Sequence, residues 1–353
     1  MKPRYFFTSL TRISDLPETL FSAEPLPRRE WETGDYVVGK VISPPSRLSG
    51  IELSSGRMVE VTEGDLVVGA FGVRYATLEA VGGWQNIGAE RQMEALTGAG
   101  LFGKATSRSA MLPSLIALSY NGHVVVNGGK ATMRDFVIPT LQRGFDLPVV
   151  LLVGTSMSAG KTTSAKVIIR LLRQEGLAVV GAKLTGAGRY RDILSMQDAG
   201  AEHIFDFVDA GLPSTVVSAR EYKKSLRNLL ARMASVGGDV VVAEVGASPP
   251  GALQRRDGYR GDRRERAMHR ALRLRPLRRD RRDVGLPEPS GPRDRARHEH
   301  GRGDRAYREA LRHSGPERTR PRLPAEAKEC LEDFSGTLTT SSLAARACTV
   351  RSP

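Results

Sequence analysis

The stretch LPVVLLVGTSMSAGKTTSAKVIIRLLRQEG at residues 147–176 decides the fold of this chain. It opens with a continuous apolar run, as expected for a strand that is buried on both faces of a parallel sheet. A loop of small residues follows. Gly160-Lys161-Thr162 then opens a segment with apolar residues at helical spacing, which stops at Gly176. A buried strand, a small-residue loop and a helix in this order predict a phosphate-binding loop.

The alternation of strand and helix continues to about residue 249. LAVVGAKL (177–184) and DVVVAEVGA (239–247) predict two more buried strands, and HIFDFVDAG (203–211) predicts a strand and a loop. RDILSMQDAGA (191–201) predicts a short helix, and AREYKKSLRNLLARMASVGG (219–238) a long amphipathic one. Such alternation predicts right-handed βαβ units and a parallel sheet. We expect the strand at 241–245 to end the sheet, without the neighbour that should cover it.

The loop itself supplies the predicted nucleotide contacts. Backbone N–H groups of such a loop bind phosphate oxygens, and the positive end of the helix dipole adds to this. Lys161 is expected to reach the β- and γ-phosphates and to act as a catalytic residue, and the hydroxyl of Thr162 to bind Mg²⁺. The predicted nucleotide-binding residues are Gly154, Thr155, Ser156, Met157, Ser158, Ala159, Gly160, Lys161, Thr162 and Thr163. The spacing departs from G-x-x-x-x-G-K-[ST], because Gly154 comes one residue early and Thr155 holds the first-glycine position.

This G-T-x-x-x-x-G-K-T loop resembles the longer-spaced loop of dethiobiotin synthetase and is similar to that of the molybdopterin-guanine dinucleotide biosynthesis adaptor. The resemblance covers residues 147–249. GAKLTGAG (181–188) resembles a family strand that ends in lysine, which implies that Lys183, as a catalytic residue, and Thr185 lie beside the phosphates or the substrate. DVVVAEVGAS (239–248) resembles a later strand and implies that Glu244 is a Mg²⁺ ligand, directly or through water. The second glycine of that family pattern is absent after Ala247.

Glu244 also stands out from the residues alone. It is a carboxylate at the C-terminal end of a predicted buried strand, where ligands bind in parallel α/β sheets. A buried acid is costly there unless a metal or a cation accompanies it, and the alternative is a carboxylate that caps the next helix. Lys183 has the alternative of an ordinary exposed strand-end lysine. Either Asp192 or Asp198 could supply a further metal ligand, and the sequence does not choose between them.

Residues before this region have a different texture. Residues 1–34 predict an irregular lead-in. From Asp35 to about Asn127, short Val-rich runs punctuated by glycine predict strands of a small β-barrel or sandwich. We therefore predict an α/β protein in which a small mostly-β domain (1–144) precedes a parallel-sheet P-loop NTPase domain (145–249).

The charge of the chain is concentrated after residue 249. The chain carries a net charge of +14, and residues 250–353 hold 26 of its 53 Lys and Arg but only 15 of its 39 Asp and Glu. This segment has no clean helical or strand period, so we expect a disordered Arg-rich tail. An arginine-rich, lysine-poor composition is typical of GC-rich coding DNA that is translated in the wrong reading frame. Codons that can encode residues 250–259, 271–279 and 307–315 give sequences typical of folded proteins when all three are read one base later.

We therefore expect a frameshift just after Pro249, by one extra base, which would leave the parallel-sheet domain truncated. The competing interpretation is a genuine basic tail that contacts nucleic acid or acidic partners. The only cysteines, Cys330 and Cys348, support neither a disulfide framework nor a CxxC metal site.

These observations predict a cytoplasmic protein that binds ATP (or GTP) with Mg²⁺. No apolar run approaches the roughly 18 residues that cross a bilayer, and the N-terminal apolar stretch is too short for a secretory signal. The predicted activity is ATP-dependent phosphoryl transfer or ligation on a small-molecule substrate, impaired here if the frame is shifted. The alternatives are a nucleotide-binding adaptor without small-molecule chemistry and a nucleic-acid binder acting through its tail. The expected partners are a nucleotide and a small-molecule substrate, and no membrane. Nucleic acid is the less favoured partner, and a homodimer is an open alternative.

Overall fold

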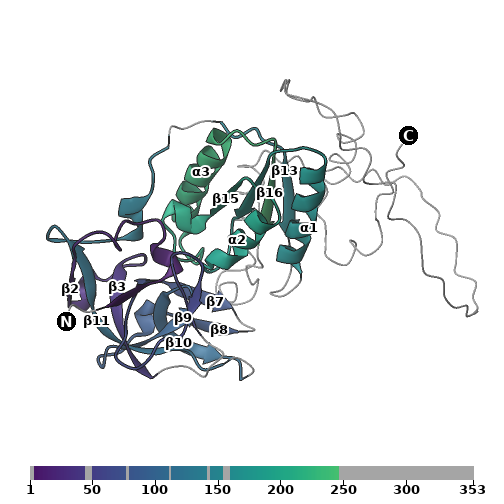
Figure 1. Ribbon diagram of the computed structural model, residues 1–353. Coiled ribbons are helices and arrows are strands. Elements are labelled where there is room, and N and C mark those ends of the chain that lie inside the picture. The colour runs from purple at the N-terminus through teal and green to yellow at the C-terminus, as the bar shows by residue number, and fades with distance from the viewer. Residues whose placement is uncertain are drawn as a thin grey trace, which may run out of the picture. The chain divides into compact units, whose positions relative to one another are not determined.

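A computed structural model of the 353-residue chain describes residues 4–43, 50–76, 79–110, 113–140, 144–153 and 160–245. The expected disordered tail, the frameshift after Pro249 and loop residues 154–159 lie outside the described residues. The described part is an α/β protein, in which a β-rich N-terminal region precedes a smaller parallel sheet with its helices (Figure 1).

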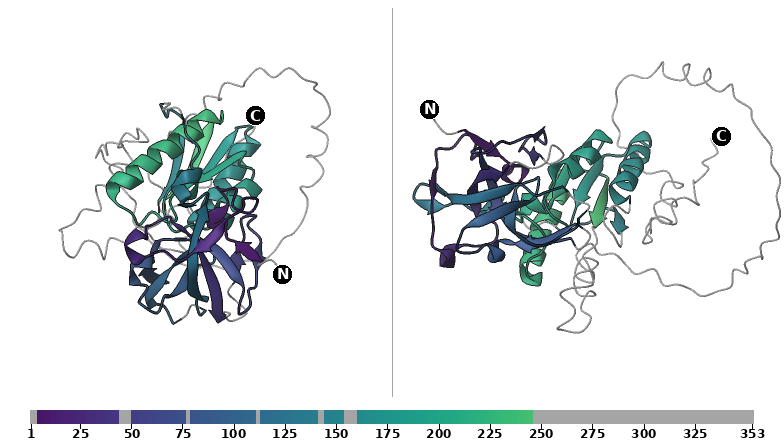
Figure 2. Two further views of the ribbon diagram at one scale, coloured as in Figure 1. Left: turned by 90° about the vertical axis from the view of Figure 1, so that its left-hand side faces the viewer. Right: turned by 90° about the horizontal axis from the view of Figure 1, so that it is seen from below.

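The N-terminal region is built around a closed ring of five strands. The strands of the whole N-terminal region are β1 (Tyr5–Phe7), β2 (Ser22–Glu24), β3 (Tyr36–Ser43), β4 (Ile51–Glu52), β5 (Met58–Val59), β6 (Leu66–Phe71), β7 (Val73–Ala76), β8 (Ala80–Gly83), β9 (Gln92–Thr97), β10 (Leu101–Arg108), β11 (Ala117–Val126) and β12 (Gly129–Lys130). The order β6-β3-β11-β9-β10 closes because β10 also pairs with β6. Figure 2 shows these strands from two further sides. The pairing confirms the β-rich region and favours the barrel over the sandwich.

The ten-stranded sheet that contains this ring is mixed and mostly antiparallel, with parallel pairs at β1–β6 and β6–β10. The expectation of an irregular lead-in over residues 1–34 is wrong in part. β1 pairs with β6 and β2 pairs with β11, so this segment supplies two strands of the sheet. These strands are three residues long, and a period of two cannot be recognised over so short a run.

A four-stranded sheet follows, and all its pairings are parallel. It contains β13 (Val149–Val153), β14 (Val179–Lys183), β15 (His203–Asp206) and β16 (Val240–Val245), in the order β13-β16-β14-β15. The helices are α1 (Lys161–Gln174), α2 (Tyr190–Asp198) and α3 (Ala219–Ser235). Each of these strands and helices lies where the apolar pattern of the sequence predicts it.

The short 3₁₀ helices of the described residues are η1 (Ser9–Thr11), η2 (Arg28–Glu30), η3 (Trp84–Asn86), η4 (Met133–Phe136) and η5 (Phe207–Ala210).

Right-handed crossovers place helices on both faces of the parallel sheet. Along the strand order β13-β16-β14-β15, α1 and α2 connect each strand to one further toward β15, whereas α3 connects β15 back to β16. With crossovers of the same hand, α3 therefore covers the face opposite to α1 and α2 (Figure 1).

The expectation that the strand at 241–245 ends the sheet is wrong. β16 lies between β13 and β14 and pairs with both, so every residue from Val240 to Val245 is buried. Within the described residues, the sheet edge on this side is instead β13, which pairs with β16 alone. Next to it on α1, Val167 and Leu171 are about half exposed (50% and 56%). In the described structure, α1 therefore carries exposed apolar side chains next to the edge strand.

One hydrophobic core joins the two regions. It contains N-terminal residues such as Leu10 and Tyr36 together with Val180, Val241 and Leu226 of the parallel-sheet region. A second core fills the ring and includes Trp31, Phe71 and Phe102. The domain boundary near residue 144 stays a prediction, because the first core crosses it. None of the helices in the described ranges combines the length and apolar character needed to span a membrane.

Candidate functional site

The candidate site lies at the C-terminal end of the parallel sheet. The sheet register pairs Leu152 with Glu244 and Glu244 with Lys183, so these three residues form a row across β13, β16 and β14. Gly160 and the first turn of α1, which follow β13 in the sequence, lie at the same end of the sheet, where Thr162 contacts Glu244. Open parallel sheets bind ligands at this end, because the loops and helix N-termini converge there.

Gly160 and Lys161 form the start of α1. Gly160 is the N-cap residue and has a left-handed backbone with φ of 77°, a conformation that glycine adopts without cost. No side chain caps this helix end, and the backbone N–H groups of a first helical turn carry partial positive charge. Lys161 is buried, with 6% of its surface exposed. The helix start therefore gathers positive charge from the backbone and from a buried ammonium group.

Thr162 and Glu244 are in direct contact. The Thr162 hydroxyl donates a 3.0 Å hydrogen bond to Glu244 Oε2, which connects the first turn of α1 to β16. Glu244 is buried, with 5% of its surface exposed, and a buried carboxylate is costly unless a cation or hydrogen-bond donors accompany it. Thr163 on the same turn is exposed. Of the two threonines, Thr162 is therefore the one placed beside the predicted metal-binding carboxylate.

The charges around Lys161 act on its ammonium group in opposite directions. Burial lowers the pKa of Lys161 most strongly, and the positive charge of Lys183 lowers it further. Glu244 opposes both, but the net pKa remains below the ordinary lysine value. A bound anion near Lys161 would favour its charged form. Lys161, Lys183 and Glu244 therefore lie close enough together to influence one another's charge at this end of the sheet.

Lys183 is held by Asp192, the third residue of α2. The Lys183 ammonium and the Asp192 carboxylate form a salt bridge that is largely buried on the lysine side, with 10% of that side chain exposed. Gly186, with φ of 133°, leaves room for this lysine, because a Cβ there would lie 3.3 Å from Lys183 Cε. The interpretation of Lys183 as an ordinary exposed lysine is wrong. Of the two open aspartates, Asp192 joins the site through Lys183, whereas Asp198 is exposed at the end of α2.

The predicted Mg²⁺ site can be tested by its donor set. Within the described ranges, no group of three or more His, Cys, Asp and Glu side chains is placed to hold a metal ion. Mg²⁺ commonly takes one or two protein oxygens and fills its octahedron with water and phosphate oxygens. The Thr162 hydroxyl and the Glu244 carboxylate fit that pattern. The predicted contacts of residues 154–159 lie outside the described residues.

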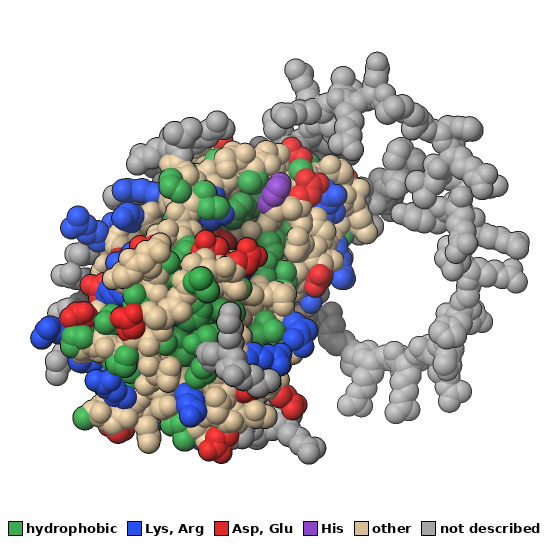
Figure 3. Space-filling model, turned by 60° about the vertical axis from the view of Figure 1, so that its left-hand side comes forward, with side chains coloured by type: hydrophobic (Ala, Val, Ile, Leu, Met, Phe, Trp, Pro, Cys, Tyr) green, Lys and Arg blue, Asp and Glu red, His purple; other side chains and the backbone are tan. Residues whose placement is uncertain are grey.

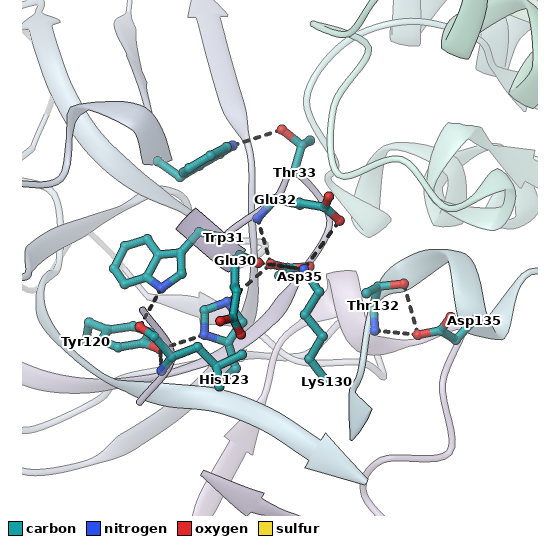
Figure 4. A network of polar contacts seen from close by, with 12 residues as sticks. Glu30, Trp31, Glu32, Thr33, Asp35, Tyr120, His123, Lys130, Thr132 and Asp135 are labelled. Carbon is teal, nitrogen blue, oxygen red and sulfur yellow. Dashed lines mark hydrogen bonds and ion pairs between the residues drawn. The ribbon is translucent and has the colours of Figure 1, made fainter. Parts of the chain in front are cut away.

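A second polar cluster, in the N-terminal region, has no signal in the sequence (Figure 4). His123 is fully buried between Tyr120 and Asp35, at 2.6 Å from the Tyr120 hydroxyl and 3.2 Å from Asp35 Oδ2. Lys130 donates to the same Asp35 oxygen at 3.2 Å and to the carbonyl oxygen of Glu30 at 2.6 Å. These residues are spread over strands and loops that only the sheet brings together. The network fixes the start of β3 against β11 and β12.

The described surface has no single basic field on the face shown in Figure 3, where Lys and Arg side chains lie among Asp and Glu. Comparison of the chain with protein-family models, with curated proteins and with solved structures found no match. The candidate function therefore rests on the geometry at the end of the parallel sheet.

Proposed function

We propose that the chain binds a Mg²⁺–nucleotide, ATP or GTP, at the C-terminal end of the parallel sheet. The observation that carries this proposal is the Thr162–Glu244 hydrogen bond beside the buried Lys161, at the start of a helix that follows a buried strand. A hydroxyl, a carboxylate, a lysine and a helix N-terminus are the groups that hold the phosphates and the metal of a nucleotide.

The roles of the chain's own residues follow from their charges. The first-turn N–H groups of α1 and the Lys161 ammonium would bind phosphate oxygens. Thr162 and Glu244 would hold Mg²⁺, which when bound neutralises charge on the phosphates. Lys183, which lies close enough to Lys161 to lower its pKa, would stabilise charge on the transferring group. The resemblance of the loop and of the strand ends in Lys183 and Glu244 to dethiobiotin synthetase supports the same assignment.

The proposed reaction is phosphoryl transfer to a small-molecule carboxylate. A carboxylate oxygen of the substrate would attack the γ-phosphorus of ATP. The bond to the β,γ-bridging oxygen then breaks, which gives an acyl phosphate and ADP. Preorganised positive charge at such a site stabilises the charge that develops on the transferring group. In this proposal, catalysis depends on positioning and charge rather than on a protein nucleophile.

Titration calorimetry of the full chain with ATP and GTP, with and without Mg²⁺, tests the proposal. We expect Mg²⁺ to strengthen binding of one or both nucleotides, and Thr162→Val to remove that enhancement while leaving the fold intact. Failure of the wild-type chain to bind either nucleotide would overturn the proposal. Nucleotide turnover that depends on an added carboxylate would then separate the enzyme from a nucleotide-binding adaptor.

A further inference from the structure

Glu52 is a buried carboxylate of the N-terminal region that contacts the parallel-sheet region. It lies at the end of β4, with 1% of its surface exposed. Its Oε2 atom accepts a hydrogen bond from the backbone N–H of Tyr190 at 2.8 Å, and Oε1 accepts one from Arg191 at 2.9 Å. The Ser9 hydroxyl donates to Oε2 at 2.6 Å. Three hydrogen-bond donors therefore fix this carboxylate in one position.

The first turn of α2 depends on this distant carboxylate. Arg189 is the N-cap residue of α2, and its side chain makes no capping hydrogen bond. The N–H groups of a first turn need acceptors, and negative charge is favourable at that end of a helix. A cap normally comes from the neighbouring chain segment. Here Glu52 supplies both the acceptor oxygens and the negative charge.

The hairpin of β4 and β5 also packs directly against α2. Gly56 forms its turn with φ of 83°, and a Cβ at this position would lie 2.3 Å from Leu194 Cδ1. A side chain at this position would have to displace the end of Leu194, so the tip of the hairpin lies on the helix. Arg12 adds a second contact, because its guanidinium lies over the ring of Tyr190 at 4.7 Å. The first half of α2 is therefore held by the N-terminal region at several points.

The same turn of α2 carries Asp192, which holds Lys183. Asp192 directly follows the two residues whose N–H groups bind Glu52, and its carboxylate forms the salt bridge to the Lys183 ammonium. Lys183 pairs in the sheet with Glu244. A shift of the first turn of α2 would move Asp192 and therefore the charge of Lys183 at the nucleotide site.

We propose that Glu52 is a positioning residue, through which the N-terminal β region holds the Asp192–Lys183 pair in place beside the bound phosphates. This inference rests on the proposed function and gives the β region a role in it. A merely structural cap would change stability and leave the nucleotide site as it is. A positioning residue changes nucleotide affinity, and it does so only while Asp192 is present.

A double-mutant cycle on the full chain separates the two roles. Glu52→Gln keeps the size of the side chain, but its amide NH₂ cannot accept the second backbone N–H. We expect Glu52→Gln to weaken Mg–nucleotide binding about tenfold, because the coupling between residues in one hydrogen-bonded network commonly changes affinity by about this factor. In the Asp192→Asn background, Glu52→Gln should have no further effect on affinity. Glu221→Gln is the matched control, since Glu221 also joins the two regions, through Arg134, but at α3.

Several outcomes would overturn the inference. One is a folded Glu52→Gln variant with wild-type affinity, and another is an effect of the same size with and without Asp192. If Glu52→Gln does not fold, Ser9→Ala removes only one hydrogen bond from the carboxylate. It should weaken binding by about two- to threefold, and unchanged affinity would again overturn the inference. A wild-type chain that binds no Mg–nucleotide would instead contradict the proposed function, and the inference with it.

Discussion

The hydroxyl of Thr162 lies 3.0 Å from Glu244 Oε2, so the second residue of α1 is hydrogen-bonded to the fifth residue of β16. These residues are 82 positions apart in the chain, and the parallel sheet brings them together. In the proposed site, this hydroxyl and this buried carboxylate would each supply an oxygen atom to Mg²⁺. In the proposed function, the metal dependence of nucleotide binding would be the property that depends most on Glu244.

Glu244→Gln should reduce the Mg²⁺ dependence of nucleotide binding, while metal-free nucleotide still binds. The amide is neutral and a poor ligand for a hard cation. A tenfold or greater increase in the Mg²⁺ concentration needed for half-maximal binding is expected, as an order of magnitude. Asp198→Asn is the control, because Asp198 is an exposed carboxylate at the C-terminal end of α2, away from Asp192 in its first turn. An unaltered Mg²⁺ titration in Glu244→Gln would remove this residue from the site.

Lys161→Met should stabilise the nucleotide-free chain at pH 7, because the buried charged form of Lys161 is disfavoured there. Burial and Lys183 lower the pKa of Lys161 in the folded state, so its charged form is disfavoured there. Between the lowered folded pKa and the unfolded value of 10.5, the unfolded chain binds more protons, and stability rises with pH. The advantage of Lys161→Met should therefore be largest below the folded pKa and shrink toward pH 10.5. Urea unfolding at several pH values measures it, and an advantage that grows with pH would contradict the sign.

Two apolar residues of α1 should respond differently to truncation. Ile169 is fully buried under the sheet, so Ile169→Ala should destabilise the chain by about 2–5 kcal/mol. Leu171 is more than half exposed, so Leu171→Ala should cost less than about 1 kcal/mol. Chemical denaturation of both variants provides the comparison. Equal losses would show that the exposed side of α1 is covered in solution.

The sequence predicts the strands and helices of the parallel-sheet region well, because each has its own apolar period. It does not predict strand order, which depends on pairing between distant segments. This is why β16 was expected at an edge and lies inside the sheet. Glu52 had no local signal, since it stands in a two-residue strand and its partners follow 138 and 139 positions later. Asp192 could be separated from Asp198 only when its contact with Lys183 was known.

In the proposed function, Lys161 binds the phosphates of a nucleotide at the start of α1. Titration calorimetry of Mg–nucleotide binding to the full chain, to Lys161→Ala and to Lys166→Ala tests it most directly. Lys166 lies on the same helix, one and a half turns further along, and controls for the loss of one positive charge. We predict that Lys161→Ala loses at least about tenfold in affinity and that Lys166→Ala stays close to wild type. Equal affinities of the wild-type chain and of a folded Lys161→Ala variant would contradict it.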